Sequence, residues 1–164
     1  MSHVTVAHNR SNHFLTPYSG GIHINRSSPV MNHLTVANNT SATDLSPGGI
    51  YSSYSDFILQ NSILWLNSPQ PNIDIFQLPD DPQAYAMSYN DIQGSNWMFW
   101  DYEGEGNINN YPSFTSSNLG DYTLMEQSLC NDAIDPNPLN NDPDGTRGDM
   151  GYHGGEFIFP NFTE

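Results

Sequence analysis

The feature that most constrains this chain is an internal repeat with a period of about 28 residues. Residues 3–9 (HVTVAHN) return as residues 33–39 (HLTVANN), at an offset of 30. The other matching segments are GGI at residues 20–22 and 48–50, residues 28–36 with residues 55–63, and a further copy at residues 86–92. Repeats of this length indicate a fold in which each unit stacks on its neighbours and buries a shared core.

Within each unit, apolar and polar residues alternate, which is the pattern of a β-strand with one buried face. The alternating pairs are Val4 and Val6, Ile22 and Ile24, Leu34 and Val36, and Ile73 and Ile75. The runs are short and are separated by Gly, Asn, Ser and Pro, and no segment sustains a helical spacing. An antiparallel sandwich would also contain short strands, but it would not repeat the same motifs at matching places. We therefore predict an all-β parallel β-helix with two or three short strands per turn.

Asn9 and Asn39 fall at equivalent positions one repeat apart. Stacked asparagines share side-chain amide hydrogen bonds along the axis of a solenoid, so one interpretation is an asparagine ladder. The other is that asparagine only fills turns, whose backbone conformations it tolerates.

The charge balance excludes whole classes of partner. The chain carries 18 acidic side chains, three arginines and no lysine, for a net charge of −15. Nucleic-acid binding requires cations that displace phosphate counterions, so we exclude it, and docking to an anionic membrane is disfavoured for the same reason. The longest apolar run is far shorter than the ~20 residues of a membrane-spanning helix, so we expect no membrane insertion. Divalent cations and neutral sugars are compatible with this charge.

The start of the chain has neither the basic nor the apolar region of an export signal, and the single Cys130 cannot form an internal disulfide. The strand pattern begins at Val4, with no preceding segment that could cap a solenoid. We therefore expect that upstream turns and a signal peptide are missing, and that the open first turn promotes end-to-end self-association.

Several segments resemble the C-terminal part of bacterial right-handed parallel β-helix proteins, the secreted or surface-anchored group related in shape to pectate lyases. They are NSILW at residues 61–65, SYNDIQG at 88–94, GEGNI at 104–108, GDYTL at 120–124, SLCNDA at 128–133 and DPDGTRGDMGY at 142–152. The last block is the most specific, since the family's tail usually reads DPDGTRADMGAY. The resemblance covers about residues 20–153.

The chain departs from the family pattern at several positions. Leu129 and Asn131 replace the family's Pro and Ile, and Ile134 stands where Gly is usual. Residues 109–114 (NNYPSF) replace a D-x-D-P-x-F run, so no role of those family aspartates carries over.

The resemblance implies architecture more than activity. Together with the repeat, it predicts a right-handed parallel β-helix over residues 1–117 and an irregular tail over residues 118–164 that packs on the last turn. It also implies a secreted or cell-surface location. We predict a non-catalytic structural, adhesive or carbohydrate-binding module with polysaccharide as its partner. The alternative is the remnant of a polysaccharide lyase or glycoside hydrolase of this fold.

The tail supplies the candidate metal site. Asp142, Asp144 and Asp149 place oxygen ligands around the glycine of a sharp turn, as in half of a calcium loop, so calcium is the candidate cofactor. A full EF-hand loop would have an acidic residue where this chain has glycine, which excludes that motif. The alternative is a structural turn in which Arg147 pairs with Asp149 or Asp132 and holds the tail.

His3 and His33 fall one repeat apart and, with His23, flank inward-pointing apolar residues, so all three should face outward. Equivalent side chains of neighbouring turns lie about 4.8 Å apart, a spacing that suits two imidazoles on one zinc ion. No third ligand can be identified, so a surface histidine ladder is the alternative.

Residues 97–102 (WMFWDY) place four aromatic side chains in six residues. Rings stack on the C–H faces of sugars while polar groups take the hydroxyls, which makes Trp97, Trp100, Asp101 and Tyr102 candidate carbohydrate-binding residues. The alternative is a loop folded back over the sheet, with its rings in a satellite core.

No catalytic residue is assigned. A β-helix lyase would need a calcium cluster with a lysine or arginine base, and a hydrolase would need paired carboxylates. Asp80 and Asp81 are adjacent but fall in a proline-bounded loop, whereas Asp56 and Asp91 lie about a repeat apart. An enzyme should bring three or more carboxylates to one sheet face, and a binding module should present aromatic or asparagine side chains there.

Overall fold

The computed structural model describes residues 1–12, 18–43, 46–76, 84–94 and 104–155, which form an all-β structure. The strands are β1 (Ser2–Ala7), β2 (Arg10–Ser11), β3 (Ile22–Asn25), β4 (Val30–Ala37), β5 (Thr40–Ser41), β6 (Ile50–Ser53), β7 (Phe57–Gln60), β8 (Ile63–Trp65), β9 (Ile73–Phe76), β10 (Tyr85–Ser88), β11 (Asp91–Ile92), β12 (Phe114–Ser116) and β13 (Asp121–Leu124). Two 3₁₀ helices, η1 (Ser117–Leu119) and η2 (Pro138–Asn140), lie in the tail. Within the described ranges, no helix has the length and apolarity to cross a membrane.

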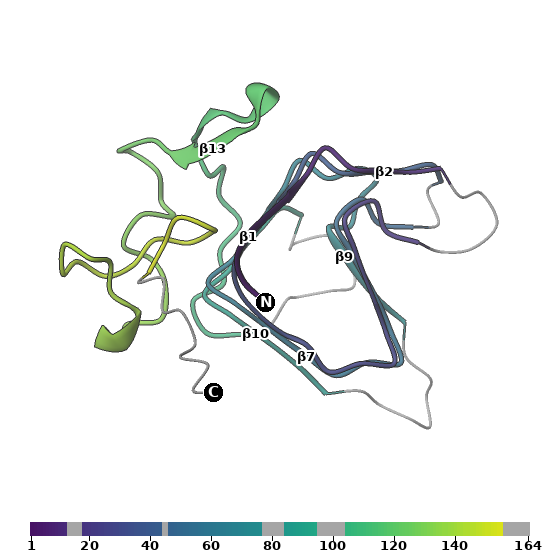
Figure 1. Cartoon of the computed structure of the whole chain (residues 1–164), viewed down its shortest axis with the longest axis horizontal. Helices are drawn as coiled ribbons and strands as arrows, with labels where there is room; N and C mark the ends of the chain where they lie inside the picture. The colour runs from purple at the N-terminus through teal and green to yellow at the C-terminus, as the bar shows by residue number, and fades with distance from the viewer. Residues whose placement is uncertain (13–17, 44–45, 77–83, 95–103, 156–164) are drawn as a thin grey trace, which may run out of the picture.

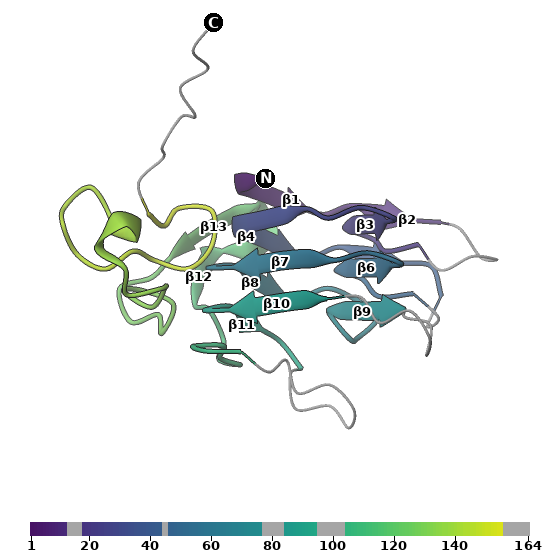
Figure 2. The same cartoon turned by 90° about the horizontal axis from the view of Figure 1, so that it is seen from below.

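Parallel pairing at the repeat spacing builds the main body. β3, β6 and β9 form one parallel sheet, and β4 pairs in parallel with β1, β7 and β8, to which β10 and β11 add. Ile22 pairs with Ile50 at an offset of 28, and Val4 pairs with Leu34 at an offset of 30. The predicted repeat is therefore confirmed as a stack of parallel strands (Figure 2), which curls around a common interior (Figure 1).

Each turn bends at corners where one residue takes a left-handed backbone conformation. These residues are Arg26 and Tyr54 at the first corner, His3, His33, Asn61 and Tyr89 at the second, and His8, Asn38 and Leu66 at the third, with φ between 47° and 60°. β4 passes through the second corner at His33, so that residues 30–32 pair with β7 and residues 35–37 pair with β8. A non-glycine residue in this conformation costs about 1–2 kcal/mol. Contacts between neighbouring turns must therefore hold the corners.

The residue that follows each corner supplies such contacts. At the third corner, Nδ2 of Asn9 donates to Oδ1 of Asn39 at 3.0 Å, and Nδ2 of Asn39 donates to Oδ1 of Asn67 at 3.0 Å. Asn39 and Asn67 also donate to the backbone carbonyls of Val6 and Val36. Of the two interpretations of Asn9 and Asn39, the structure shows the asparagine ladder, and Asn67 extends it by one turn.

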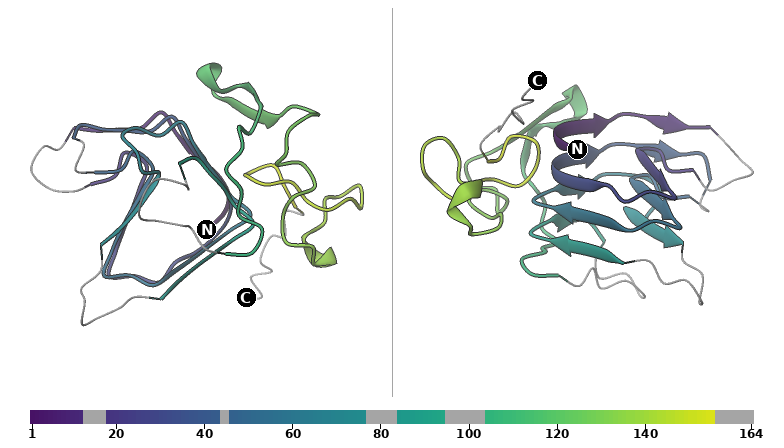
Figure 3. Two further views of the ribbon diagram at one scale, coloured as in Figure 1. Left: turned by 180° about the vertical axis from the view of Figure 1, so that it is seen from behind. Right: turned by 60° about the horizontal axis from the view of Figure 1, so that its bottom comes forward.

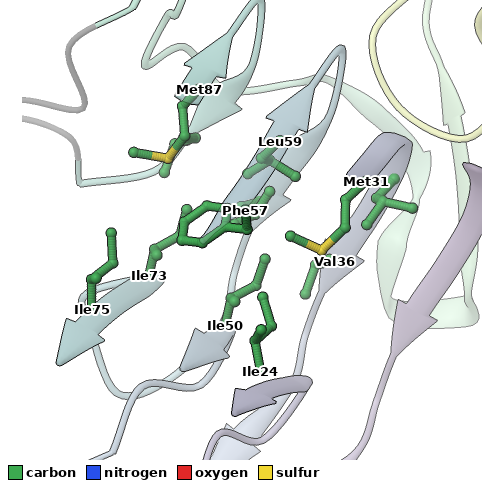
Figure 4. Packing of buried hydrophobic residues seen from close by; sticks show 12 residues of the cluster. Ile24, Met31, Val36, Ile50, Phe57, Leu59, Ile73, Ile75 and Met87 are labelled. Carbon is green, nitrogen blue, oxygen red and sulfur yellow. The ribbon is translucent and has the colours of Figure 1, made fainter. Parts of the chain in front are cut away.

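Inward-facing apolar residues from the stacked strands form the main core. Its buried members are Ile24, Met31, Leu34, Val36, Ile50, Phe57, Leu59, Leu64, Ile73, Ile75, Met87 and Ile92. Figure 4 shows Phe57 in the middle of this cluster, among residues of three successive turns. Val4, Val6 and Ile22 pack against the cluster from the first turn. The alternation read from the sequence therefore marks the buried face correctly.

The chain beyond the stacked strands lies against their side (Figures 1 and 3). β12 and β13 form an antiparallel hairpin, and the expected domain boundary at residue 118 falls within its η1 connection. The hydroxyl of Tyr122 accepts from Nδ2 of Asn38 at 2.9 Å, and the N–H of Gly151 donates to the carbonyl of Asn61 at 2.9 Å. We expected the tail to pack on the last turn; its contacts instead run along the side of several turns. Ala37, Ile63 and Trp65 of the strands are buried together with tail residues in a second apolar cluster.

Candidate functional site

The outer surface of the sheet β3–β6–β9 gathers aromatic and polar side chains. Because the isoleucines of these strands point into the core, the alternate residues point outward. The register aligns His23, Tyr51 and Asp74 in one row across three turns, and Phe76 lies in the next row. We call this surface the aromatic face, formed by Tyr18, His23, Tyr51, Tyr54 and Phe76.

The rings of the aromatic face contact one another in edge-on arrangements. The ring centroids of His23 and Tyr51 lie 5.3 Å apart at 86°, and those of Tyr54 and Phe76 lie 5.5 Å apart at 75°. The Tyr18 ring lies 5.0 Å from that of His23. Tyr18 and Phe76 are each 43% exposed, whereas Tyr51 is buried. The face therefore presents the exposed rings of Tyr18, His23 and Phe76 beside the buried ring of Tyr51.

Polar groups border these rings. The Arg26 guanidinium carbon lies 5.4 Å from the centroid of the Tyr54 ring. Burial raises the pKa of the Asp74 carboxyl and lowers the pKa of the His23 imidazole. Burial, with a smaller effect of the nearby Asp74, raises the pKa of the Tyr51 hydroxyl. At pH 7 the imidazole and the phenol are therefore neutral, and both can exchange hydrogen bonds with an uncharged ligand.

The carbohydrate-binding residues expected from the sequence, Trp97, Trp100, Asp101 and Tyr102, lie outside the described residues. The aromatic face was missed because its members come from four separate segments. The sequence already marked His23 as outward-facing, and the strand alternation would have marked Phe76 in the same way. Ile50 pairs with Ile73 at an offset of only 23 residues, however, so the third strand does not align with the repeat.

The acidic side chains expected to bind calcium lie near one another, and each has a local partner. Oδ1 of Asp142 accepts from the N–H of Gly155 at 2.6 Å, and Oδ1 of Asp149 accepts from the N–H of Asp132 at 2.8 Å. Asp144 accepts from both the N–H and the hydroxyl of Thr146. The pKa values of the Asp142 and Asp149 carboxyls are raised, first by burial and then by neighbouring carboxylates. Across the described ranges, no three His, Cys, Asp or Glu side chains are grouped so that they could hold a metal ion.

Arg147 holds the tail through carbonyl oxygens. Its guanidinium donates to the carbonyls of Ala133 and Ile134, the former at 3.2 Å, and its central carbon lies 5.7 Å from the ring centroid of Tyr89. The alternative to a calcium site was a structural turn in which Arg147 pairs with Asp149 or Asp132. The contacts of its guanidinium are instead with backbone oxygens and a ring.

His3 and His33 stack as their repeat spacing predicts, with ring centroids 4.7 Å apart and planes inclined by 8°. The tail covers them, so that His33 is buried although it points away from the core. Nε2 of His3 lies 2.9 Å from the carbonyl oxygen of Gly154, whereas neither ring nitrogen of His33 has a hydrogen-bond partner. Burial, aided by the neighbouring His3, lowers the pKa of His33 to about 4. The expected histidine ladder of His3 and His33 is therefore present, but the tail covers it.

Asp91 is a buried carboxyl away from the aromatic face. Its Oδ2 accepts from the thiol of Cys130 at 3.2 Å and its Oδ1 accepts from the N–H of Asn110 at 3.0 Å. Burial raises the pKa of Asp91 to about 7 and also raises the pKa of the Cys130 thiol. Asp56, considered with Asp91 as a hydrolytic pair, precedes β7 and lies on the other side of the second corner. The other acidic pair, at residues 80 and 81, lies outside the described residues.

Comparison with known proteins does not help to interpret the aromatic face, so its interpretation rests on its own side chains. The chain matches no family model, no curated protein and no solved structure.

Proposed function

We propose that this chain is part of a right-handed parallel β-helix that serves as a non-catalytic structural or adhesive module and binds carbohydrate through the aromatic face. Successive turns pair in parallel at the repeat offset, as the turns of a β-helix do. Connections between parallel strands of one sheet are right-handed in about 98% of cases, which supports the handedness. The resemblance of the tail block supports a secreted or cell-surface location.

The observation that carries the binding proposal is the exposure of the Tyr18 and Phe76 rings beside polar groups on one sheet face. Sugar rings stack their C–H faces on such rings. The imidazole of His23 and the carboxyl of Asp74 can then take the hydroxyl groups. The net charge of −15 repels uronate polymers, so the ligand is a neutral polysaccharide.

End-to-end association through the first turn belongs to the same proposal. Val4, Val6 and Ile22 are only partly buried, and β1 and β3 are the first strands of their sheets. A second copy that pairs with these edges would extend the stack and complete the burial of the three side chains.

Binding to immobilised neutral and acidic glycans tests the proposal. We expect a neutral oligosaccharide to bind and the double variant Tyr18→Ala, Phe76→Ala to weaken that binding about tenfold, because two stacking rings are lost. Tyr111→Ala is the matched control, since this tyrosine is 58% exposed but lies outside the aromatic face, between β11 and β12. The proposal is wrong if no neutral glycan binds, or if Tyr111→Ala weakens binding as much as the double variant.

A further inference from the structure

The outer surface of the strands β4, β7 and β10 carries an apolar row separate from the aromatic face. Val30 pairs with Ile58, and Ile58 pairs with Ala86, so that the three side chains line up across successive turns. The next outward row on the same strands is polar and consists of Asn32, Gln60 and Ser88. An apolar residue recurs at the outward position in each of three turns, where strand alternation would place polar ones.

This row borders a cavity of about 360 Å³. Pro29, Val30, Phe57, Ile58, Tyr85 and Ala86 supply most of its lining. Val30 is 54% exposed, Tyr85 is 39% exposed and Ile58 is 38% exposed, so large apolar side chains face solvent here. Phe57 and Tyr85, whose rings stack 5.7 Å apart, also contribute to the lining. The volume is at the low end of the ~300–1,000 Å³ typical of ligand pockets, which suits one bulky apolar group.

The charge around the cavity indicates which kind of partner could carry such an apolar group. Asp56 lines the cavity and is exposed, and its Oδ1 is held by the N–H of Ala84 at 2.7 Å. None of the described residues that line the cavity is basic. With a net charge of −15 on the chain, the surrounding field attracts cations and repels anions. An apolar pocket with a fixed carboxylate and a negative field is complementary to a partner that joins an apolar anchor to positive charge.

We propose that this groove binds a basic peptide segment whose aliphatic or aromatic side chain fills the cavity while a neighbouring lysine or arginine faces Asp56. The anchor gives affinity by removing Val30 and Ile58 from water. The basic residues accelerate association and make the affinity sensitive to salt. This groove is independent of the sugar site, because the two surfaces belong to different sheets.

The fluorescence anisotropy of a fluorescein-labelled peptide KKWLKK tests the proposal. We expect the double variant Val30→Thr, Ile58→Thr to bind about tenfold more weakly than the unmodified chain, because it loses the apolar anchor site. Threonine keeps the β-branch, so the strands are preserved, and circular dichroism verifies this. Asp56→Asn should weaken binding about threefold and reduce its salt dependence. Leu119→Thr is the control, since this leucine is 86% exposed at the hairpin connection.

Two further probes need no variant. The peptide KKGGKK, which lacks the anchor, should bind at least tenfold more weakly than KKWLKK, and the acidic peptide EEWLEE should not bind. Equal binding of KKGGKK would overturn the proposal, because charge alone would then explain the interaction. Light scattering addresses the other occupant: an oligomer that the Val30→Thr, Ile58→Thr variant dissociates would show that a second copy fills the groove, and would also overturn the proposal.

Discussion

The stacked strands and the tail are stabilised in different ways. In the stack, the same contacts recur on each turn: parallel backbone pairing, an inward apolar row and polar side chains that follow each corner. The tail has one short hairpin, and it attaches through a second apolar cluster and single hydrogen bonds. Two buried titratable side chains, His33 and Asp91, lie where the regions meet. We therefore expect the stack to be stable over its whole length. We expect single substitutions, or a change of pH, to detach the tail from the stack.

The largest effect should come from the main core. Leu59 is fully buried, and we expect Leu59→Ala to lower the free energy of unfolding by about 4 kcal/mol in chemical denaturation followed by circular dichroism. Ile134→Ala is the matched change in the tail cluster, where the side chain is equally buried. It should speed hydrogen exchange in the tail while β4 and β7 stay protected. Equal loss of protection in β4 and β7 with both variants would show that the regions unfold as one unit.

The second effect concerns pH, and the two groups where the regions meet act in opposite directions. The pKa of His33 is lowered to about 4 in the folded chain, against about 6.5 in the unfolded chain. Its contribution to the free energy of unfolding is therefore fully present above pH 6.5 and is lost as the pH falls toward 4. The pKa of Asp91 is raised to about 7 in the folded chain, against about 3.8 in the unfolded chain. Its contribution to the free energy of unfolding is therefore fully present below pH 3.8 and is lost as the pH rises toward 7. Between pH 4 and 6.5 the effects of His33 and Asp91 on the free energy of unfolding therefore nearly cancel.

Single variants separate the two contributions. His33→Asn keeps a residue that tolerates the left-handed conformation, and its stability should fall as pH rises from 4 to 6.5 because Asp91 acts alone. Asp91→Asn should lose stability as pH falls over the same range. Each change should amount to about 3 kcal/mol, measured by denaturation at several pH values. Other carboxyls titrate alike in both variants, so parallel curves for the two would contradict the assignment.

The third effect is that of the asparagine ladder. Asn39 is fully buried and bonds both neighbouring turns, so Asn39→Ala should lower the free energy of unfolding by about 2 kcal/mol. Asn131→Ala provides the comparison in the tail, where the side chain donates to two carbonyls but keeps access to water. Its cost should stay below about 1 kcal/mol when both variants are measured by chemical denaturation followed by circular dichroism. An equal cost for both variants would mean that stacking adds nothing to an asparagine at a turn.

The sequence predicted the features that depend on the repeat. The equivalence of Asn9 and Asn39 and the stack of His3 on His33 are repeat properties, and both are present. The corners were not predicted, because residues such as Tyr54 and Leu66 have no intrinsic preference for the left-handed conformation and are held there by neighbouring turns. The position of the tail also escaped prediction, since it depends on outward-facing side chains distant in the sequence.

The candidate sites show the same distinction between local motifs, which the sequence reveals, and contacts between distant segments, which it does not. The aspartates of the tail could be located from one short motif, and they lie near one another. The aromatic face draws Tyr18, Tyr51 and Phe76 from segments far apart, and only the register of β3, β6 and β9 brings these segments together.

The most direct measurement of the parallel stack is an engineered disulfide between register partners. Asn32 and Gln60 are paired at an offset of 28, and the Cα atoms of paired strands lie about 4.8 Å apart, within disulfide range. In a Cys130→Ser background, Asn32→Cys with Gln60→Cys should oxidise readily, as thiol titration and mass spectrometry would show. The control is Asn32→Cys with Ser88→Cys, which lie two turns apart and should stay reduced. Rapid oxidation of the control, or failure of the register pair in folded protein, would contradict the stack.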